Sequence, residues 1–310
     1  MVTTLAMFGP YDAELMCHAH SKGARVVLKG DVHLSYIVDK SNRTTWITDQ
    51  VNLAKRQFMD GINIDIEQAV DEGSPEYYAL TNLVKETTAA FHKEIPGSQV
   101  SDVAWSPKCI DKRCYDYVTI AESCDLLFVM SYDEQSQITG DCIGMANAPL
   151  LQTLEAYQEY IDLKIDAKKL VMGVPWYGYD YPCVNLSQKG ACYIEKVPFR
   201  GAPCSDAAGR QKPYEWIMKQ LNSSMSGRLW DDEQKAPYFY YKDQNGQIHQ
   251  VWYDDPQSIC PKADHAKAKG LRGIGMWNGN ILDYSHDPVA VQQTAMMWNA
   301  LLGCYDTPCL

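Results

Sequence analysis

Short apolar segments alternate with amphipathic ones along most of the chain, and this alternation constrains the fold more than any other feature. The apolar segments are four or five residues long, and the segments between them carry apolar residues at helical spacing. Strands and helices that alternate at intervals of roughly 35–45 residues form βα units around a parallel sheet. We expect strands near 5–8, 25–28, 61–67, 103–105, 126–130, 170–174 and 273–277, and helices near 12–22, 46–58, 80–95, 151–163 and 289–302.

A long interval interrupts this alternation before the last strand. Residues 179–270 are too many for one βα connection, and Asn245-Gly246 lies between two aromatic segments, which is typical of a β-hairpin. We therefore predict a barrel domain made of residues 1–178 and 271–303. An inserted α+β subdomain of residues 179–270 would form one wall of a cleft.

The segment 61–67 places polar residues at every second position. In a strand, Asn63, Asp65 and Glu67 share one face, and neighbours on that face lie roughly 6–7 Å apart. Two carboxyl groups this close do not both ionise freely, so one should stay protonated near neutral pH. The alternative is an ordinary amphipathic strand with one solvated face.

Composition excludes several classes of function. The net charge is −11 without a basic stripe, which argues against nucleic acid as a partner. No apolar run reaches the ~18–20 residues of a membrane span. The sequence contains neither a metal-ligand cluster nor a nucleotide-binding loop, so we expect no metal and no cofactor. Twenty tyrosines and eight tryptophans suit stacking on sugar rings, although they also suit a core.

Eleven cysteines and three glycosylation sequons favour the secretory pathway. The sequons place candidate glycosylation sites at Asn42, Asn185 and Asn222. The cysteines form no C-x-x-C pair, and their odd number leaves at least one thiol free or paired between chains. The first residues lack the basic start and apolar run of a signal peptide, so either the chain is cytosolic or its natural start is missing.

Five segments resemble, in order, the motifs of glycoside hydrolase family 18, the chitinase family. Asp60-Gly61-x-x-x-Asp65-x-Glu67 is similar to its D-G-x-D-x-D-x-E strand. Met130-Ser131-Tyr132-Asp133 resembles M-x-Y-D, and Pro175-Trp176-Tyr177-Gly178 resembles P-x-Y-G. Trp252-Tyr253-Asp254-Asp255 and Gly273-Ile274-Gly275-Met276-Trp277 resemble the late segments. The resemblance covers most of the chain.

The chain also departs from the family pattern. Asn63 stands where the family has a second aspartate, and Lys29-Gly30-Asp31 occupies the region of the S-x-G-G strand. The family's motif glutamate lies on strand four, yet only two expected strands precede it here. The resemblance thus implies a TIM-type (β/α)8 barrel that lacks its first strand, unless a weak strand hides in the short starting segment.

The resemblance implies substrate-assisted hydrolysis with retention of configuration, an exception to the two-carboxylate rule. Glu67 would protonate the glycosidic oxygen, and the N-acetyl oxygen of the substrate would attack to form an oxazolinium ion. Asp65 would hold the acetamido N–H, and Tyr132 would bind the acetamido oxygen. For Glu67 the alternative is a structural ion pair, and for Tyr132 a residue at the rim of the barrel.

Other residues would bind or support the substrate. The resemblance implies substrate contacts for Trp277, Tyr177, Asp133 and Met130, with Trp277 as the floor of the sugar site. Core filling by Trp277 and helix capping by Asp133 are the alternatives. Asn63 would donate a hydrogen bond to Asp65 and so favour its ionisation relative to a carboxylate neighbour. Asp60 would support the site from behind, or only mark the start of the strand.

The implied substrate is β-1,4-linked N-acetylglucosamine, as in chito-oligosaccharides and the chitobiose core of N-linked glycans. The most similar family members act in the lysosome, and we expect a monomer that acts alone on an oligosaccharide. Two alternatives stay open: a chitin-binding, lectin-like protein, although such relatives usually lack the glutamate, and a truncated chain with impaired activity.

Overall fold

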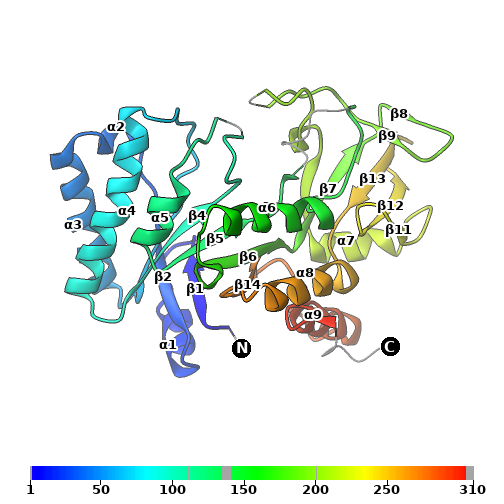
Figure 1. The fold of residues 1–310 in the computed structure, drawn as a ribbon. Helices are drawn as coiled ribbons and strands as arrows, with labels where there is room; N and C mark the ends of the chain where they lie inside the picture. Colours follow the sequence, from blue (N-terminus) through cyan, green and yellow to red (C-terminus); the bar gives the residue numbers. More distant parts are fainter. Residues whose placement is uncertain (1, 111, 135–140, 200, 305–310) are drawn as a thin grey trace. The chain divides into compact units, whose positions relative to one another are not determined.

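The chain forms two compact units (Figure 1). The computed structural model describes residues 2–110, 112–134, 141–199 and 201–304. Residues 1–129 and 160–170 belong to the first unit, and residues 130–159 and 171–310 belong to the second. Within the described ranges, every helix is too short or too polar to cross a membrane.

The first unit contains parallel strands that follow one another in chain order. Each strand pairs with the next, from β1 to β5. The central strands are buried on both faces, as expected for a parallel sheet covered by helices; Ile62 and Ile64 have no exposed surface. The strands are β1 (Thr4–Met7), β2 (Arg25–Gly30), β3 (Gly61–Ile64), β4 (Gln99–Ala104) and β5 (Leu126–Met130).

Helices connect these strands and begin at capping residues that the sequence provides. Asp12 accepts hydrogen bonds from two backbone N–H groups of α1, and Ser74 caps α4 just before Pro75. Helices α2, α3 and α4 pack against one another beside the sheet (Figure 1). The helices are α1 (Ala13–Ser21), α2 (Leu34–Ile37), α3 (Lys40–Arg56), α4 (Pro75–Glu94) and α5 (Tyr117–Ser123).

The second unit contains the last two parallel strands and the helices around them. Strand β6 (Leu170–Pro175) pairs with β14 (Gly273–Trp277), and the Trp176 N–H donates to the Trp277 carbonyl at 2.8 Å. Helix α8 (Pro256–Ala268) packs against β14 and begins with a reciprocal capping box between Asp255 and Ser258. The other helices near this pair are α6 (Leu150–Asp162) and α9 (Pro288–Ala300).

Between β6 and β14 the chain forms an antiparallel sheet of five strands. Its strand order is β10-β7-β13-β12-β11, and the expected hairpin at Asn245-Gly246 joins β12 to β13. Gly178 needs to be glycine because a Cβ there would lie 2.2 Å from the Trp252 carbonyl oxygen. The elements are β7 (Tyr177–Pro182), β10 (Arg210–Pro213), α7 (Tyr214–Leu221), β11 (Leu229–Asp231), β12 (Ala236–Lys242) and β13 (Ile248–Trp252).

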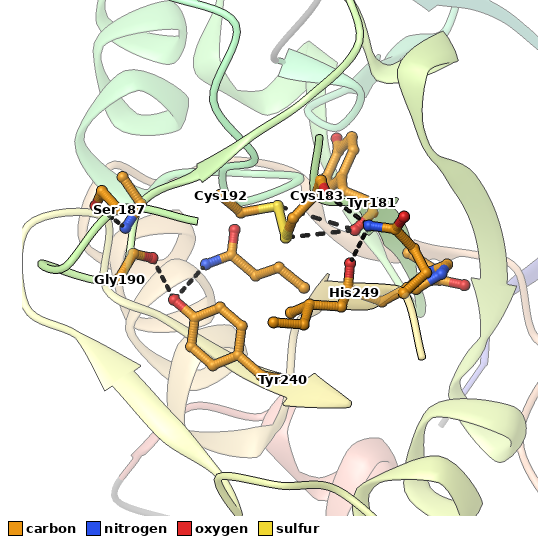
Figure 2. Close-up of a disulfide and its surroundings, with 12 residues drawn as sticks. Tyr181, Cys183, Ser187, Gly190, Cys192, Tyr240 and His249 are labelled. Atoms are coloured by element: carbon orange, nitrogen blue, oxygen red, sulfur yellow. Dashed lines mark hydrogen bonds and ion pairs between the residues drawn. A yellow bond between two sulfur atoms is a disulfide. The ribbon is translucent and has the colours of Figure 1, made fainter. Parts of the chain in front are cut away.

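Four disulfides cross-link eight of the ten described cysteines, and Figure 2 shows the surroundings of one of them. Cys183–Cys192 closes a loop that contains the short strands β8 (Asn185–Leu186) and β9 (Cys192–Tyr193). The Tyr240 hydroxyl of β12 donates to the Gly190 carbonyl and so ties this loop to the antiparallel sheet. The other disulfides are Cys109–Cys114, Cys142–Cys204 and Cys260–Cys304, while Cys17 and Cys124 are free thiols.

The architecture confirms the expected parallel strands linked by helices, with an antiparallel insertion before the last strand. Five parallel strands in the first unit and two in the second are described, one fewer than the eight of a complete barrel. One detail is wrong: the predicted strand 61–67 ends at Ile64, so Asp65 and Glu67 lie in the segment that follows it. The proposed domain boundaries stay a prediction.

Candidate active site

The acidic residues of the motif follow the carboxyl end of β3. Gly61 starts this strand at φ 151°, and a Cβ there would lie 1.8 Å from the Gln99 carbonyl oxygen, so only glycine lets β3 approach β4 this closely. After the strand, the Asp65 N–H donates to the Gly30 carbonyl of β2 at 2.7 Å. The functional end of a parallel strand is its carboxyl end, and the motif acids lie there.

Asp65 is the more buried of the two acids. Burial raises its pKa to about 6, and the negative charge of Glu67 adds to this shift. Lys29, whose Nζ lies 3.4 Å from Asp65 Oδ2, opposes the shift by favouring the carboxylate. Asp65 therefore gains a proton in mildly acidic solution.

Glu67 lies in a more open environment than Asp65. Its side chain is 47 % exposed, whereas that of Asp65 is 12 % exposed. Arg113 Nη1 donates to Glu67 Oε2 at 2.9 Å, and an arginine has only donors to offer. For Asp65, burial is the largest cause of the raised pKa.

Asn63 makes a different hydrogen bond from the expected one. Its Oδ1 accepts from the Ser101 hydroxyl of β4 at 2.8 Å, so the described contacts of its side chain lead to Ser101 and not to Asp65. On the same strand as Ser101, Asp102 is only 2 % exposed, and burial and the charge of Asp65 hold its pKa well above the usual range. The sequence signal for Asp102 was an acid inside a strand whose six residues are all buried.

Asp60 lies at the other end of β3, which corrects its expected place behind the site. Its Oδ2 accepts from the backbone N–H of Val26 at 2.8 Å and lies 2.8 Å from His20 Nε2. These contacts join the beginning of β3 to β2 and α1. These contacts agree with the alternative interpretation of Asp60, that it stands at the start of the strand.

The second unit gathers tyrosines around Asp133. Asp133 Oδ1 accepts hydrogen bonds from the Tyr177 hydroxyl at 2.5 Å and the Tyr179 hydroxyl at 2.8 Å. Burial and the Asp133 charge hold the pKa of Tyr177 well above its usual range, so it stays a donor. Gln211 in turn donates to the Tyr179 oxygen at 3.0 Å. The sequence predicted Asp133 and Tyr177, but it gave no signal for Tyr179 as a partner.

Asn147 holds the backbone of this cluster. Asp133 has φ 56°, an unusual conformation outside glycine, and its N–H donates to Asn147 Oδ1 at 2.7 Å. The Asn147 amide donates to the Tyr177 carbonyl at 3.2 Å, and the side chain is fully buried. One amide thus links the loop after β5 to the start of β7.

The other expected contact residues also lie in the second unit. Tyr132 is buried, and its ring meets the Tyr177 ring edge-on at a centroid distance of 5.9 Å. Met130 ends β5 and is buried, and Trp277 ends β14 half-buried. The structure therefore groups Tyr132 with Asp133 and Tyr177, and it groups Asp65 with Glu67 in the first unit.

The sequon asparagines differ in accessibility. Asn185 and Asn222 are exposed, and Asn42 is half-buried in the first turn of α3. Among the residues that the structure describes, no group of three or more His, Cys, Asp or Glu side chains has the arrangement of a metal site.

Sequence relatives share most of this chain. It matches the model of the family "Glycosyl hydrolases family 18" over residues 16–280. It is 67 % identical to human di-N-acetylchitobiase over 301 residues, which cover 97 % of this chain and 78 % of the human protein. The mouse protein of the same name is 66 % identical, and the match covers 97 % of this chain and 82 % of the mouse protein.

Solved structures share the fold at low sequence identity. A family 18 N-acetylglucosaminidase from Paenibacillus barengoltzii has a TM-score of 0.74 at 16 % identity, covering 96 % of this chain and 93 % of its own. The class V chitinase from Nicotiana tobaccum has a TM-score of 0.70 at 19 % identity, covering 97 % and 90 %. Together with the ordered motifs, these matches show that the chain has the TIM-barrel fold and belongs to glycosyl hydrolases family 18, and that it is a glycosidase.

Proposed function

We propose that this protein hydrolyses β-1,4-linked N-acetylglucosamine in chito-oligosaccharides and in the chitobiose core of N-linked glycans, with retention of configuration. The 67 % identity to a protein named di-N-acetylchitobiase supports this substrate class. The two acids at the carboxyl end of β3 support the reaction class, because glycoside cleavage requires a proton donor beside a negative charge.

The proposed reaction runs in two steps. Glu67 gives a proton to the glycosidic oxygen while the acetamido oxygen of the substrate attacks the anomeric carbon, which breaks the glycosidic bond and forms an oxazolinium ion. The Glu67 carboxylate then takes a proton from water. The water oxygen bonds to the anomeric carbon on the face that the departed sugar occupied, which breaks the bond to the acetamido oxygen and opens the oxazolinium ring. The acid of the first step is regenerated, so protons balance.

Asp65 and Tyr132 would guide the substrate amide. An ionised Asp65 accepts the acetamido N–H and offsets the positive charge of the ring intermediate, whereas a protonated Asp65 cannot offset that charge. Tyr132 would donate to the acetamido oxygen and fix its line of attack. Trp277, Tyr177, Asp133 and Met130 would form the binding surface.

The pair of carboxyl groups that follows β3 is the observation that carries this proposal. Burial raises the pKa of Asp65 to about 6, so Asp65 is ionised, as its proposed role requires, above about pH 6. The shift arises from burial and from Glu67, so the two acids act as a coupled pair in the region where the family places its chemistry.

The stereochemistry of the first product tests the mechanism. Proton NMR of freshly started chitobiose hydrolysis should show the β-anomer before mutarotation, and a thiazoline analogue of the oxazolinium ion should inhibit competitively. Appearance of the α-anomer first would contradict the proposal. Glycan binding without turnover would instead favour the lectin-like alternative, and absence of both would favour an impaired chain.

The remaining proposals concern the cell and the assembly state. We propose a lysosomal, monomeric glycoprotein with glycans at the exposed Asn185 and Asn222, and at Asn42. Glycosidase digestion followed by mass spectrometry would identify the modified asparagines.

A further inference from the structure

We propose that Arg113 and Tyr115, from the loop that follows β4, together position Glu67 for proton transfer. This inference rests on the proposed role of Glu67 as the acid. Neither residue belongs to the motif, and both are positioning residues that act through Glu67. Arg113 holds the side chain of Glu67, and Tyr115 holds the main chain directly before and after Glu67.

Tyr115 fixes the main chain around Glu67. Its hydroxyl lies 3.1 Å from the Ile66 carbonyl oxygen and 2.6 Å from the Gln68 carbonyl oxygen, the residues directly before and after Glu67. Burial raises the pKa of Tyr115 far above its usual value, so its O–H remains available to these two acceptors. Since β3 ends at Ile64, sheet hydrogen bonds do not provide this support.

Arg113 fixes the carboxyl group itself. Its guanidinium is 6 % exposed and stacks on the Trp105 ring at 4.4 Å, so its direction is set before it meets Glu67. Nη1 then donates to Glu67 Oε2 at 2.9 Å. A glutamate side chain that is 47 % exposed has several accessible rotamers, and a rigid charged donor selects among them.

The loop that carries both residues is joined to the segment after Glu67. The Val70 N–H donates to the Lys112 carbonyl at 2.8 Å, and the Cys114 N–H donates back to the Val70 carbonyl at 3.1 Å. The Cys109–Cys114 disulfide closes the same loop. The loop that carries Arg113 and Tyr115 is therefore hydrogen-bonded to the same segment that contains Glu67.

Leaving-group dependence separates positioning of the acid from general damage. In chitobiose the leaving group is a sugar alcohol that needs protonation, whereas a dinitrophenyl glycoside releases a stable phenolate that needs none. Because Glu67 also acts as the base in the second step, the comparison uses kcat/KM, which reports cleavage of the glycosidic bond. A misplaced acid lowers kcat/KM only for chitobiose, while a partly unfolded protein loses activity on both substrates to the same extent. Misplacement by about 1 Å costs on the order of 100-fold in rate.

The test uses R113Q, R113K and Y115F with matched controls R56Q and Y78F, whose parent side chains are exposed on α3 and α4. We expect kcat/KM on chitobiose to fall about 10- to 100-fold in R113Q and Y115F. The kcat/KM for the dinitrophenyl glycoside of N-acetylglucosamine should fall less than about threefold. R113K should recover part of the loss, because it keeps a charged donor without the planar fork.

Hydrogen exchange reads the same contacts without turnover. The backbone amides of residues 66–72 should exchange faster in Y115F and R113Q than in the parent protein. Their exchange rate in Y78F and R56Q should equal that of the parent. Equal losses on both substrates, or exchange that does not change in Y115F, would overturn the positioning role. If the parent protein turns over neither substrate, the proposed function fails, whereas the exchange result still decides whether the contacts hold this segment.

Discussion

The two acids that follow β3 differ in their surroundings, and burial raises the pKa of Asp65. Asp65 is enclosed and has a pKa of about 6, while Glu67 reaches further out and contacts Arg113. Spacing in the sequence showed that the two carboxyl groups would be neighbours. It did not show which one would be buried, because burial depends on segments that are distant in the chain.

Replacing Asp65 tests this assignment through stability. A folded pKa of about 6 against 3.8 for the free group means that the folded state binds the proton more tightly. The resulting penalty is absent below about pH 4 and grows as pH rises to about 6. D65N should therefore be more stable than the parent at pH 7.5. The difference in unfolding free energy between variant and parent should be about 2 kcal/mol larger at pH 7.5 than at pH 4.

Thermal melts at the two pH values provide the measurement. The control is D31N, because Asp31 also lies 3.4 Å from Lys29 but is more exposed. Its effect on stability at pH 7.5 should be smaller than that of D65N. A D65N effect that does not depend on pH would refute the assignment of the raised pKa to Asp65.

Asn147 provides a second test at the scale of one residue. N147A removes the acceptor for the Asp133 N–H and the donor for the Tyr177 carbonyl, which leaves two polar groups of the buried loop without this partner. We expect a loss of about 2–4 kcal/mol in the free energy of unfolding. Urea titration should show it, whereas N82A on the exposed face of α4 should change stability by less than about 0.5 kcal/mol.

Among the elements, α8 combines strong start signals with a buried charge. Asp255 and Ser258 form its capping box, and one turn later Lys262 lies fully buried with Nζ 2.5 Å from Asp254 Oδ1. Burying such a pair costs desolvation free energy, which the strong attraction between the two charges offsets. Neither this helix nor its buried lysine was among the elements expected from the sequence.

Removing one partner of this pair should destabilise the second unit. K262M leaves the Asp254 carboxylate buried without its cation, and we expect a loss of about 3–5 kcal/mol. The double variant K262M/D254L should regain most of that loss. The matched control K242M lies at the exposed end of β12. Calorimetry measures all three, and a single variant as stable as the parent would count against the contribution of the ion pair.

Across the whole molecule, disulfides constrain stretches of chain of very different length. Cys142–Cys204 spans 62 residues and Cys183–Cys192 spans nine. If loop entropy in the unfolded state dominates, losing the first costs about 4 kcal/mol and losing the second about 2–3 kcal/mol. Denaturant titration of the two paired Cys-to-Ser variants should reproduce this order, and the reverse order would show that native contacts dominate instead.

Much of the fold was predictable because local signals agreed with the global pattern. The strands at 126–130, 170–174 and 273–277 and the hairpin at Asn245-Gly246 form where turn chemistry and apolar periodicity place them. The site was less predictable. Arg113, Asp102 and Asn147 act through partners 14 to 46 positions away, and periodicity carries no information about such contacts.

The central claim is that Glu67 is the acid of a glycosidase acting on N-acetylglucosamine linkages, and the E67Q variant tests it most directly. Glutamine keeps the size and polarity of the side chain but cannot donate a catalytic proton. Chitobiose turnover by E67Q should fall at least about 100-fold, while calorimetric binding of chitobiose and the melting temperature stay near those of the parent. Undiminished turnover by the variant would contradict the account.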